Sequence, residues 1–422
     1  MEYSSLLQEA ASYQKKLTDY RHYLHAHAEV DFDLSQTVAY VKEQLTQMGY
    51  DPVPCGRSGL MAIAGGKKPG KVFLLRADMD ALPIREESGV DFASHNGQMH
   101  ACGHDMHTAM LLGAARLLKD HEDEICGTVK LMFQPAEETL GGALDMIHHG
   151  ILQNPNVDAA MMIHVMTGCP LPEGTVIIAP AGISAPAADM FEIRIQGQGC
   201  HGSSPNTGID PLNVAAHILI SLQELHAREL AMIDRAALTI GSLHAGSAPN
   251  VIPDTAVMGG SLRAFNEETR RFLKERLIQI AQGTAALFRA QATVTFTCGC
   301  PTLYNDPDLC RDAEIYLTDL LGDTKAFSTE KLASMAAASA PSTPDSTKRN
   351  TSVAGSEDFA YVSQQVPAVM LSLAAGHPDH GHQHALHHPR ATFSDEVLPV
   401  GSAVHACMAM RWLEEHSDQQ RR

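Results

Sequence analysis

The chain has 422 residues, of which 44% are hydrophobic and 19% are charged, as in an ordinary globular protein long enough for two domains. Its formal net charge of −18 argues against a nucleic-acid partner, and it contains no run of about 18 uncharged apolar residues that would predict a membrane span. Nine cysteines, an odd number, and an N-terminus without the regions of a signal peptide favour a reduced, cytoplasmic protein over a disulfide-bonded secreted one.

The first part of the chain alternates helical periodicity with short apolar runs. The periodicity predicts helices over 4–25, 34–48, 108–118, 142–149 and 307–321. Apolar runs bounded by glycine and proline predict buried strands over 59–65, 71–75, 127–133, 159–163 and 368–373. Buried strands of this kind, separated by helices, predict an α/β domain.

The stretch Met99–Thr108 contains a thiol, three imidazoles and a carboxylate just before a helix. Cys102 and His104 are two residues apart, so in an extended segment both would point to the same side and reach one ion. Two ligands can start a metal site but cannot complete one. The alternative is a buried cysteine followed by Asp105 as the cap of the helix.

Further residues of metal-binding type follow the ends of the predicted strands. Asp78 and Asp80 follow one strand, Glu137 and Glu138 follow the next, and His164 ends a third. Open α/β sheets place their sites at this edge. Neighbouring side chains on an extended backbone diverge, so one glutamate can bind a metal while the other faces water or substrate.

From about residue 187 the pattern changes to strands that alternate apolar and polar residues, which predicts a sheet with one wet face. The order is strand, helix, strand, strand, helix, strand, at 188–196, 211–228, 237–243, 256–263, 267–289 and 292–297. This order predicts an inserted, ferredoxin-like α+β domain. The expected domains are therefore a catalytic domain in two segments, 1–186 and 298–422, and an inserted domain, 187–297.

The last segment holds three further features. The tract from Ser328 to Ser352, rich in alanine, serine, threonine and proline, predicts a mobile surface loop. Residues 355–360 are expected to open a helix with Ser356 as its cap. Six histidines lie between His377 and Pro389, and such density alone does not show which of them binds a metal.

Eight motifs, and their order along the chain, resemble the amidohydrolase branch of the aminoacylase and carboxypeptidase family of two-metal peptidases. This branch includes hippurate hydrolases, N-acyl-amino-acid amidohydrolases and plant hydrolases of auxin conjugates. The motifs are Arg76–Pro83, His100–Asp105, Gln134–Glu138, His164–Val165, His201 after a glycine-rich turn, Asn250–Asp254, Gly355–Phe359 and a terminal His-x-Pro. The resemblance implies an aminopeptidase-like catalytic domain, with a mixed sheet flanked by helices, and an inserted domain that acts as a lid or in dimerisation.

The resemblance also implies the roles of individual residues. The implied metal ligands are Cys102, His104, Glu138, His164 and His387, with His388 as the alternative to the last. Glu137 would be the general base, Asp80 would orient a ligand, and His201 would stabilise the oxyanion in the active site of a partner subunit. Asn250 and Arg263 would recognise the substrate carboxylate, with a role as a structural ion-pair partner as the alternative for Arg263. Two divalent ions per subunit are implied, zinc or manganese first, with cobalt and nickel open.

The expected activity is hydrolysis of the amide bond of N-acyl-L-amino acids, which releases a carboxylic acid and a free amino acid. A dipeptidase and a deacetylase of an acetylated diamino acid are alternatives within the same chemistry. A non-enzymatic binding protein is the third hypothesis, and the retention of Glu137 and of every ligand argues against it. The expected partners are a small-molecule substrate and a second copy of the chain, in a homodimer or a higher homo-oligomer.

Overall fold

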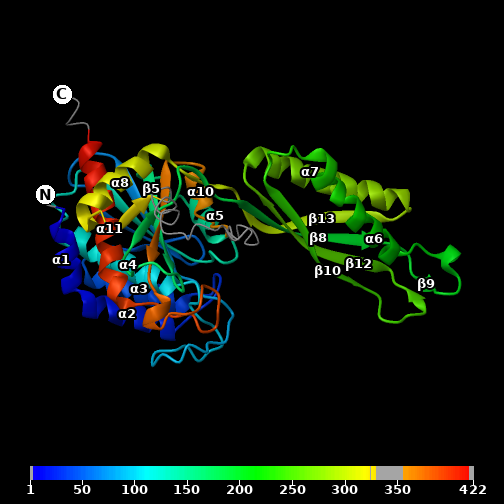
Figure 1. The fold of residues 1–422 in the computed structure, drawn as a ribbon, viewed down its shortest axis with the longest axis horizontal. Coiled ribbons are helices and arrows are strands. Elements are labelled where there is room, and N and C mark those ends of the chain that lie inside the picture. Colours follow the sequence, from blue (N-terminus) through cyan, green and yellow to red (C-terminus); the bar gives the residue numbers. More distant parts are fainter. Residues whose placement is uncertain (1–2, 324, 329–354, 418–422) are drawn as a thin grey trace, which may run out of the picture. The chain divides into compact units, whose positions relative to one another are not determined.

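The computed structural model describes residues 3–323, 325–328 and 355–417 (Figure 1). These residues form two compact units. Unit 1 comprises the described residues up to Ser184, from Tyr304 to Ser328 and from Tyr361 onward, and unit 2 comprises Ala185–Leu303 with 355–360. The tract predicted as a mobile loop lies outside the described residues apart from Ser328 at its start, which ends strand β15.

Unit 1 is built on an eight-stranded mixed sheet in the order β1-β2-β4-β3-β5-β16-β6-β15. Strands β3, β4, β5 and β16 run parallel, so their carboxyl ends share one edge of the sheet. The strands are β1 (Val53–Cys55), β2 (Gly59–Gly65), β3 (Val72–Asp78), β4 (Thr128–Gln134), β5 (Ala159–Met166), β6 (Val176–Ile178), β15 (Ala326–Ser328) and β16 (Ala368–Ala374). The expected mixed sheet is confirmed, and its shared edge is where the predicted ligands follow the strands.

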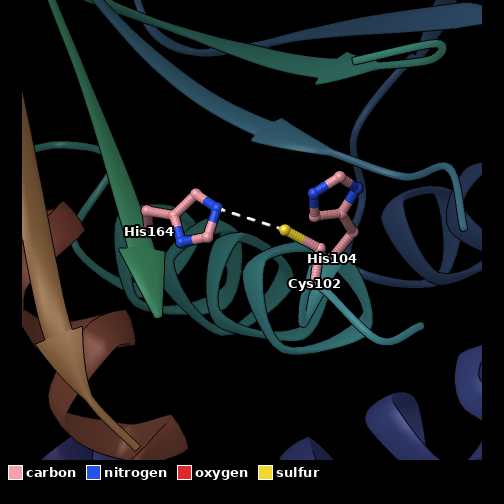
Figure 2. Close-up of side chains that lie close together, drawn as sticks. All are labelled: Cys102, His104 and His164. Atoms are coloured by element: carbon pink, nitrogen blue, oxygen red, sulfur yellow. Dashed lines mark hydrogen bonds between the residues drawn. The ribbon is translucent and has the colours of Figure 1, made fainter. Parts of the chain in front are cut away.

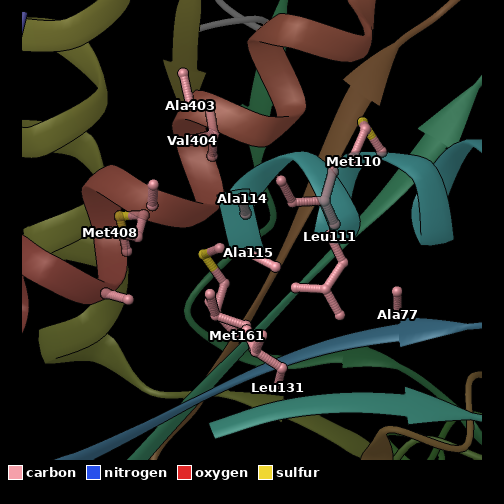
Figure 3. Packing of buried hydrophobic residues seen from close by; sticks show 14 of the residues in the cluster. Ala77, Met110, Leu111, Ala114, Ala115, Leu131, Met161, Ala403, Val404 and Met408 are labelled. Atoms are coloured by element: carbon pink, nitrogen blue, oxygen red, sulfur yellow. The ribbon is translucent and has the colours of Figure 1, made fainter. Parts of the chain in front are cut away.

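Helices α4 (His104–Asp120) and α11 (Leu398–Glu415) pack side by side against the sheet. Figure 3 shows their apolar side chains meeting those of Ala77, Leu131 and Met161 on the strands. Both helices are buried almost all round because α1 (Ser5–Ser12) and α2 (Gln14–Ala26) cover their outer side. The other helices of unit 1 are α3 (Ser35–Gln47), α5 (Gly142–His148), α8 (Pro307–Leu321) and the short α10 (Ala360–Ser363).

Glycine allows α4 and α11 to approach closely. A Cβ atom at Gly401 would lie 1.9 Å from the Met110 sulfur, and one at Gly113 would lie 2.2 Å from the Ser402 hydroxyl. Any larger residue at these two positions would force the helices apart and open a void in the core. Each Å³ of cavity that stays empty lowers the free energy of unfolding by about 24 cal/mol, so the close approach of the two helices stabilises unit 1.

Four predicted elements differ in the structure. In unit 2 the helix expected over 211–228 ends at Ser221, and a short π-helix follows over Leu225–Glu229. The helix expected over 4–25 is two helices, α1 and α2, which meet at Tyr13. The helix after the metal-binding stretch begins at His104 rather than at Thr108. The helix expected to open at 355 begins only at Ala360, and Ser356 does not cap it, because the Ser356 hydroxyl donates to Pro186 O instead.

Unit 2 contains a four-stranded antiparallel sheet in the order β10-β12-β8-β13, with α6 and α7 packed against it (Figure 1). Along the chain the elements are β8 (Ala187–Gln196), α6 (Pro211–Ser221), β10 (Ala236–Ala245), β12 (Thr255–Ala264), α7 (Glu267–Leu287) and β13 (Gln291–Cys300). This is the ferredoxin-like order that the sequence predicts. Outside this sheet, β9 (Cys200–His201) pairs with β11 (Val251–Ile252), and β7 (Gly182–Ala185) pairs with β14 (Leu303–Asn305).

Apolar packing on one face of its sheet holds unit 2 together. Ile193 and Ile195 of β8 are fully buried, whereas the residues that alternate with them, Glu192, Arg194 and Gln196, are exposed. Leu273 and Leu277 of α7, one turn apart, belong to the same buried cluster. Each fully buried side chain of this size contributes about 2 kcal/mol, so the apolar alternation of β8 determines which face the helices cover.

Within residues 3–323, 325–328 and 355–417, no helix is long and apolar enough to cross a membrane.

Candidate metal centre

Cys102 and His104 converge because the chain turns between them, and not because it is extended as the sequence suggested. Gly103 has φ +86°, in the left-handed region, and His104 is the first residue of α4. A Cβ at position 103 would lie 2.4 Å from the Val165 side chain, so only glycine fits here. The turn joins the thiol to the first turn of the helix and leaves the ligand atoms of Cys102 and His104 within 4.8 Å of each other and of His164.

Cys102, His104 and His164 form the first half of the centre (Figure 2). Cys102 Sγ lies 3.5 Å from His164 Nε2. His104 Nδ1 donates to the Asp80 carbonyl at 2.7 Å, and His164 Nδ1 donates to the Val165 carbonyl at 2.7 Å. In the neutral form of both rings the lone pair is therefore on the other nitrogen, Nε2, which is how backbone carbonyls prepare histidines to bind metals.

Glu138 and His387 form the second half, and Cys102 belongs to both halves. His387 Nε2 lies 3.2 Å from Cys102 Sγ and 3.4 Å from Glu138 Oε1. The N–H of His387 donates to Ala101 O at 2.9 Å, which ties its loop to the Cys102 turn. His388 is exposed and its ring stacks on a neighbouring histidine instead. The structure thus brings together all five predicted ligands and places His387, not His388, beside the thiol.

The spacing of these atoms fits metal ions. Two ligand atoms around one tetrahedral zinc ion are about 3.4 to 3.6 Å apart, given usual zinc–nitrogen and zinc–sulfur distances. The separations of 3.2 to 3.5 Å around Cys102 match this value. His104 Nε2 is buried and has no hydrogen-bond partner among the described residues, although Glu137 Oε2 lies 3.9 Å away and Glu138 Oε1 4.0 Å away. Two carboxylates that face this nitrogen favour positive charge between them, either a proton on the ring or a bound cation.

The electrostatics also favour a cation. Burial would raise the pKa of the Cys102 thiol, but the charge of His164 and hydrogen bonds from the surrounding imidazoles lower it to about 6. The thiolate is the form that binds metals. Hydrogen bonds to Cys102 and Glu138 raise the pKa of His387 to about 10, and Asp78 raises the pKa of His104 despite its burial. The raised pKa values of the two histidines indicate surroundings that stabilise positive charge, and the lowered pKa of the thiol favours the thiolate that would bind a cation.

The glutamate pair lies on a turn, so the extended backbone expected for it is wrong. Ala136 has φ +53°, and the turn that follows directs the N–H groups of Glu137 and Glu138 toward Asp80. Asp80 Oδ1 accepts the first at 3.0 Å and Oδ2 accepts the second at 3.2 Å. Asp80 is buried and holds the backbone of both glutamates, while its carbonyl holds His104. This is the orienting position that the sequence predicts for it.

A buried network of hydrogen bonds supports the candidate centre. One of its members, His107, has no role predicted from the sequence. His107 Nε2 accepts the N–H of Val165 at 2.9 Å, so its Nδ1 donates to Asp78 Oδ1, at 2.6 Å. Burial lowers the pKa of His107 to about 4, so the ring is neutral. Arg76 donates to the same carboxylate. The network joins the ends of β3, α4 and β5, and the signal that could have revealed it is the i, i+3 spacing of His104 and His107 on one helix face.

Asp105 does not cap α4, contrary to the alternative raised above. The N-cap position is Gly103, and the Asp105 side chain is buried and accepts hydrogen bonds from Arg21 and His25 of α2. Burial would raise the pKa of Asp105, but the Arg21 guanidinium and His25 hold it well below its usual range. These buried pairs attach α2 to the first turn of α4, which carries His104.

The remaining predicted residues lie in unit 2. His201 is exposed on β9, and its Nδ1 accepts the N–H of Ser203 at 3.1 Å. Asn250 lies beside it, because Val251 pairs with His201 and Gly202 N donates to Asn250 O at 2.8 Å. The pair β9–β11 lies beyond one end of the four-stranded sheet (Figure 1). His201 and Asn250 are thus neighbours in the fold.

Asn250 precedes the first residue of β12, whereas Arg263 lies next to the last residue of this strand. Its Nη1 donates to the Ser356 hydroxyl, a neutral acceptor, and among the described residues no carboxylate forms an ion pair with it. From the start of β12 to Arg263 the strand advances by about 25 Å at the usual rise per residue. Asn250 and Arg263 of one chain are therefore too far apart to hold the same carboxylate.

Comparisons with known proteins identify the family of the chain. The model of peptidase family M20/M25/M40 matches residues 74–411. An N-acetyl-L-cysteine deacetylase of Bacillus subtilis is 35% identical over 96% of this chain and 90% of its own length. An IAA-amino acid hydrolase (ILR1-like 2) of Arabidopsis thaliana is 36% identical over 94% of this chain and 84% of its own length.

Solved structures show the same similarity. A putative aminohydrolase from methicillin-resistant Staphylococcus aureus has a TM-score of 0.84 and 30% identity, over 98% of this chain and 100% of its own. A dinuclear metal-binding peptidase of the M20 family from Bacillus subtilis has a TM-score of 0.74 and 30% identity, over 96% of this chain and 99% of its own. The family match covers most of the chain and includes every residue of the centre. The chain therefore belongs to peptidase family M20/M25/M40.

Proposed function

We propose that this enzyme hydrolyses the amide bond of N-acyl-L-amino acids with two divalent metal ions held by Cys102, His104, Glu138, His164 and His387. The observation that carries the proposal is the buried Nε2 of His104, which faces two carboxylates and has no hydrogen-bond partner among the described residues. The relatives named as a deacetylase of an N-acetyl amino acid and as a hydrolase of amino-acid conjugates support the substrate class.

The donor set favours zinc, with manganese as the second candidate and cobalt or nickel open. A thiolate is a soft ligand that suits zinc, whereas the carboxylate and imidazoles suit several ions. Bound ions would supply Lewis acidity toward the amide carbonyl and lower the pKa of water. The thiol must remain reduced for this role, which agrees with a cytoplasmic location, and the nine cysteines are free thiols in the structure.

Glu137 is the proposed general base. Its carboxylate Oε2 lies 3.9 Å from His104 Nε2, at the rim of the ligand cluster, and its backbone is fixed by Asp80. A carboxylate in this place takes a proton from water and returns it to the leaving amine. Glu138 holds a metal at the same time, because its Oε1 faces His387 across 3.4 Å. The turn at Ala136 thus presents neighbouring glutamates for different tasks.

The substrate carboxylate is recognised by Arg263 and Asn250 from two subunits. Within one chain these residues lie at opposite ends of β12, so they can act on one substrate only when each comes from a different copy. The Arg263 guanidinium has no carboxylate partner among the described residues and can grip a carboxylate through paired hydrogen bonds. We therefore propose a homodimer in which His201 and Asn250 complete the active site of the partner, where His201 stabilises the oxyanion.

The test compares an N-acyl amino acid with its C-terminal amide. Hydrogen bonds to a charged group contribute about 1.5 to 3 kcal/mol, so kcat/KM should fall about 10- to 150-fold for the amide. Arg263→Gln should remove most of this preference. Arg194→Gln, which changes an exposed arginine on the neighbouring strand β8, should keep it. Equal cleavage of acid and amide by the parent enzyme would show that carboxylate recognition is wrong and that the enzyme is a broader amidase.

A further inference from the structure

One buried arginine of α2 joins two segments of the chain that carry proposed metal ligands. Arg21 is only 2% exposed. Its Nε donates to Asp105 Oδ2 at 3.0 Å, in the first turn of α4, directly after the ligand that begins this helix. Its Nη1 donates to the carbonyl oxygen of Phe393 at 3.0 Å and to the Asp395 carboxylate, in the loop that follows His387. One guanidinium therefore holds two segments that are far apart in the sequence.

The shape of the guanidinium suits this task. Its nitrogens lie in one rigid plane and donate in different directions, so one side chain can reach both segments at once. The guanidinium carbon of Arg21 also lies 5.3 Å from the centre of the Phe92 ring and 5.7 Å from that of the Phe393 ring. At such distances a cation interacts favourably with an aromatic ring. Hydrogen bonds and packing together therefore fix the position of the guanidinium.

The loop 387–395 lies directly against the turn that joins the thiol to α4. A Cβ atom at Gly103 would lie 3.1 Å from Phe393 Cε1, so the phenylalanine ring packs on this turn. At the start of the loop, the N–H of His387 donates to Ala101 O at 2.9 Å. The loop is thus attached near its start by a backbone hydrogen bond and near its end by the arginine of α2.

The two segments do not depend equally on Arg21. Asp105 keeps a second buried partner, because its Oδ2 also lies 2.9 Å from His25 Nδ1. The buried carbonyl of Phe393 accepts from Arg21 and from no other donor among the described residues. Loss of the guanidinium would leave this acceptor unpaired, which is costly for a buried polar group. The loop 387–395 would therefore be loosened more than the first turn of α4.

We propose that Arg21 is a positioning residue of the metal centre, which sets the place of His387 relative to Cys102. The inference rests on the proposed function, since it assumes that His387 is a metal ligand. Replacing a residue that orients metal ligands typically lowers metal affinity about 10- to 100-fold. Arg21 therefore controls the affinity for an ion on the side of Glu138 and His387 more than for an ion on the side of His164.

The first experiment measures metal affinity in Arg21→Gln. The full chain is stripped of metal with a chelator, and equilibrium dialysis against Co²⁺ under reducing conditions gives the dissociation constant of each bound ion. We expect one of these constants to rise about 10- to 100-fold. The absorption band of the sulfur-to-cobalt charge transfer should persist, because Cys102, His104 and His164 remain in place.

Arg270→Gln is the matched control, because Arg270 is mostly buried and pairs with two carboxylates, those of Asp189 and Glu267, in unit 2. Both variants should lower Tm, but only Arg21→Gln should weaken metal binding. If Arg21→Gln does not fold, Asp395→Ala decides. This variant removes an acceptor that is 24% exposed and leaves the arginine its bond to α4, so it should weaken the same ion by a smaller factor.

The second experiment needs no metal. Hydrogen–deuterium exchange of the metal-free proteins, followed by mass spectrometry, reports how often the loop 387–395 opens. The N–H groups of Ala391 and Ser394 donate to backbone carbonyls. They should therefore exchange faster in Arg21→Gln than in the parent, and at the parent rate in Arg270→Gln.

Three results would overturn the proposal. They are an unchanged metal affinity in folded Arg21→Gln and Asp395→Ala, an unchanged exchange of the loop 387–395, and the loss of the charge-transfer band. The last would show that the arginine supports the whole centre rather than the place of His387. A parent that binds no metal would contradict the proposed function, and the exchange rates would still decide whether Arg21 holds this loop.

Discussion

Asp80 holds the backbone that carries both glutamates of the centre, and its two oxygens accept different N–H groups. Asp80→Asn replaces one of these oxygens by an amino group, which cannot accept a hydrogen bond. One bond to a charged acceptor is lost, and one buried N–H is left facing another donor. The direct consequence is a displacement of Glu137 or Glu138, which lie at the affected peptide groups.

The expected loss follows from the strength of such bonds. A hydrogen bond to a charged group contributes about 1.5 to 3 kcal/mol, and about 1.4 kcal/mol corresponds to a factor of ten. Because the displaced backbone carries the proposed base and a proposed ligand, kcat/KM should fall about 10- to 150-fold. Steady-state kinetics on an N-acyl amino acid measures this loss, and atomic emission spectroscopy on the same samples measures the metal content.

Asp306→Asn is the matched control. Asp306 also accepts two backbone N–H groups, those of Asp308 and Leu309, but both bond to the same oxygen, Oδ1, at 3.0 Å. Asparagine keeps one oxygen and is an equally good N-cap for α8, so this variant should behave like the parent. Asp306 also lies at the opposite end of β16 from the loop of His387, since its N–H donates to Ala368 O. The reasoning is refuted if folded Asp80→Asn keeps full metal content and a kcat/KM within about twofold of the parent.

Three further predictions concern the base, the dimer and a buried histidine. Glu137→Gln should keep both metal ions and lower kcat about 10²- to 10⁴-fold, whereas Glu138→Ala should lower the metal content. The reverse pattern of metal contents would show that Glu138 is the base and Glu137 the ligand. Mixing inactive His201→Ala with inactive Glu137→Gln subunits should restore part of the activity in heterodimers, and no recovery after proven subunit exchange would exclude action in trans. Burial opposes the charge of His25, but Asp105 and Glu86 raise the pKa of His25 to about 9. The charged histidine therefore contributes its full share of the free energy of unfolding below about pH 6.5, and this contribution is lost as the pH rises through 9. Chemical denaturation between pH 6 and 10 should show a decline in the free energy of unfolding that is smaller in His25→Gln, and an equal decline in both proteins would contradict the assignment.

The sequence predicts the sheet and the convergence of the ligands because both depend on local patterns. Each of the strands β3, β4 and β5 is an apolar run that ends next to a residue of metal-binding type, and parallel strands necessarily bring such ends to one edge. The His-x-Pro register likewise indicates His387, which the structure places beside Cys102. The ligand roles themselves stay predictions that the metal contents of variants will test.

The local geometry of the centre could not be predicted in the same way. Alanine gives no signal for the positive φ of Ala136, which depends on the acceptance of two N–H groups by Asp80, more than fifty residues earlier. The role of His107 depends on contact with β5, equally far along the chain. By contrast, the separation of Asn250 from Arg263 was accessible from the sequence, because the predicted strand 256–263 lies between them and a strand has a known rise per residue.

Backbone strain at the centre connects metal binding to folding. Ala136 and His387 both have φ in the left-handed region, at +53° and +64°, where a residue with a side chain costs about 1 to 2 kcal/mol. The first directs the backbone of the two glutamates, and the second presents an imidazole to Cys102, so the strain lies where the ligands must be positioned. In addition, the carboxylates of Glu137 and Glu138 would repel the lone pair of a neutral His104. Positive charge, either a proton on His104 or a bound cation, turns this repulsion into attraction, so a metal ion bound there would also stabilise the fold. The five proposed ligands are therefore expected to contribute to the folding of unit 1 as well as to its chemistry.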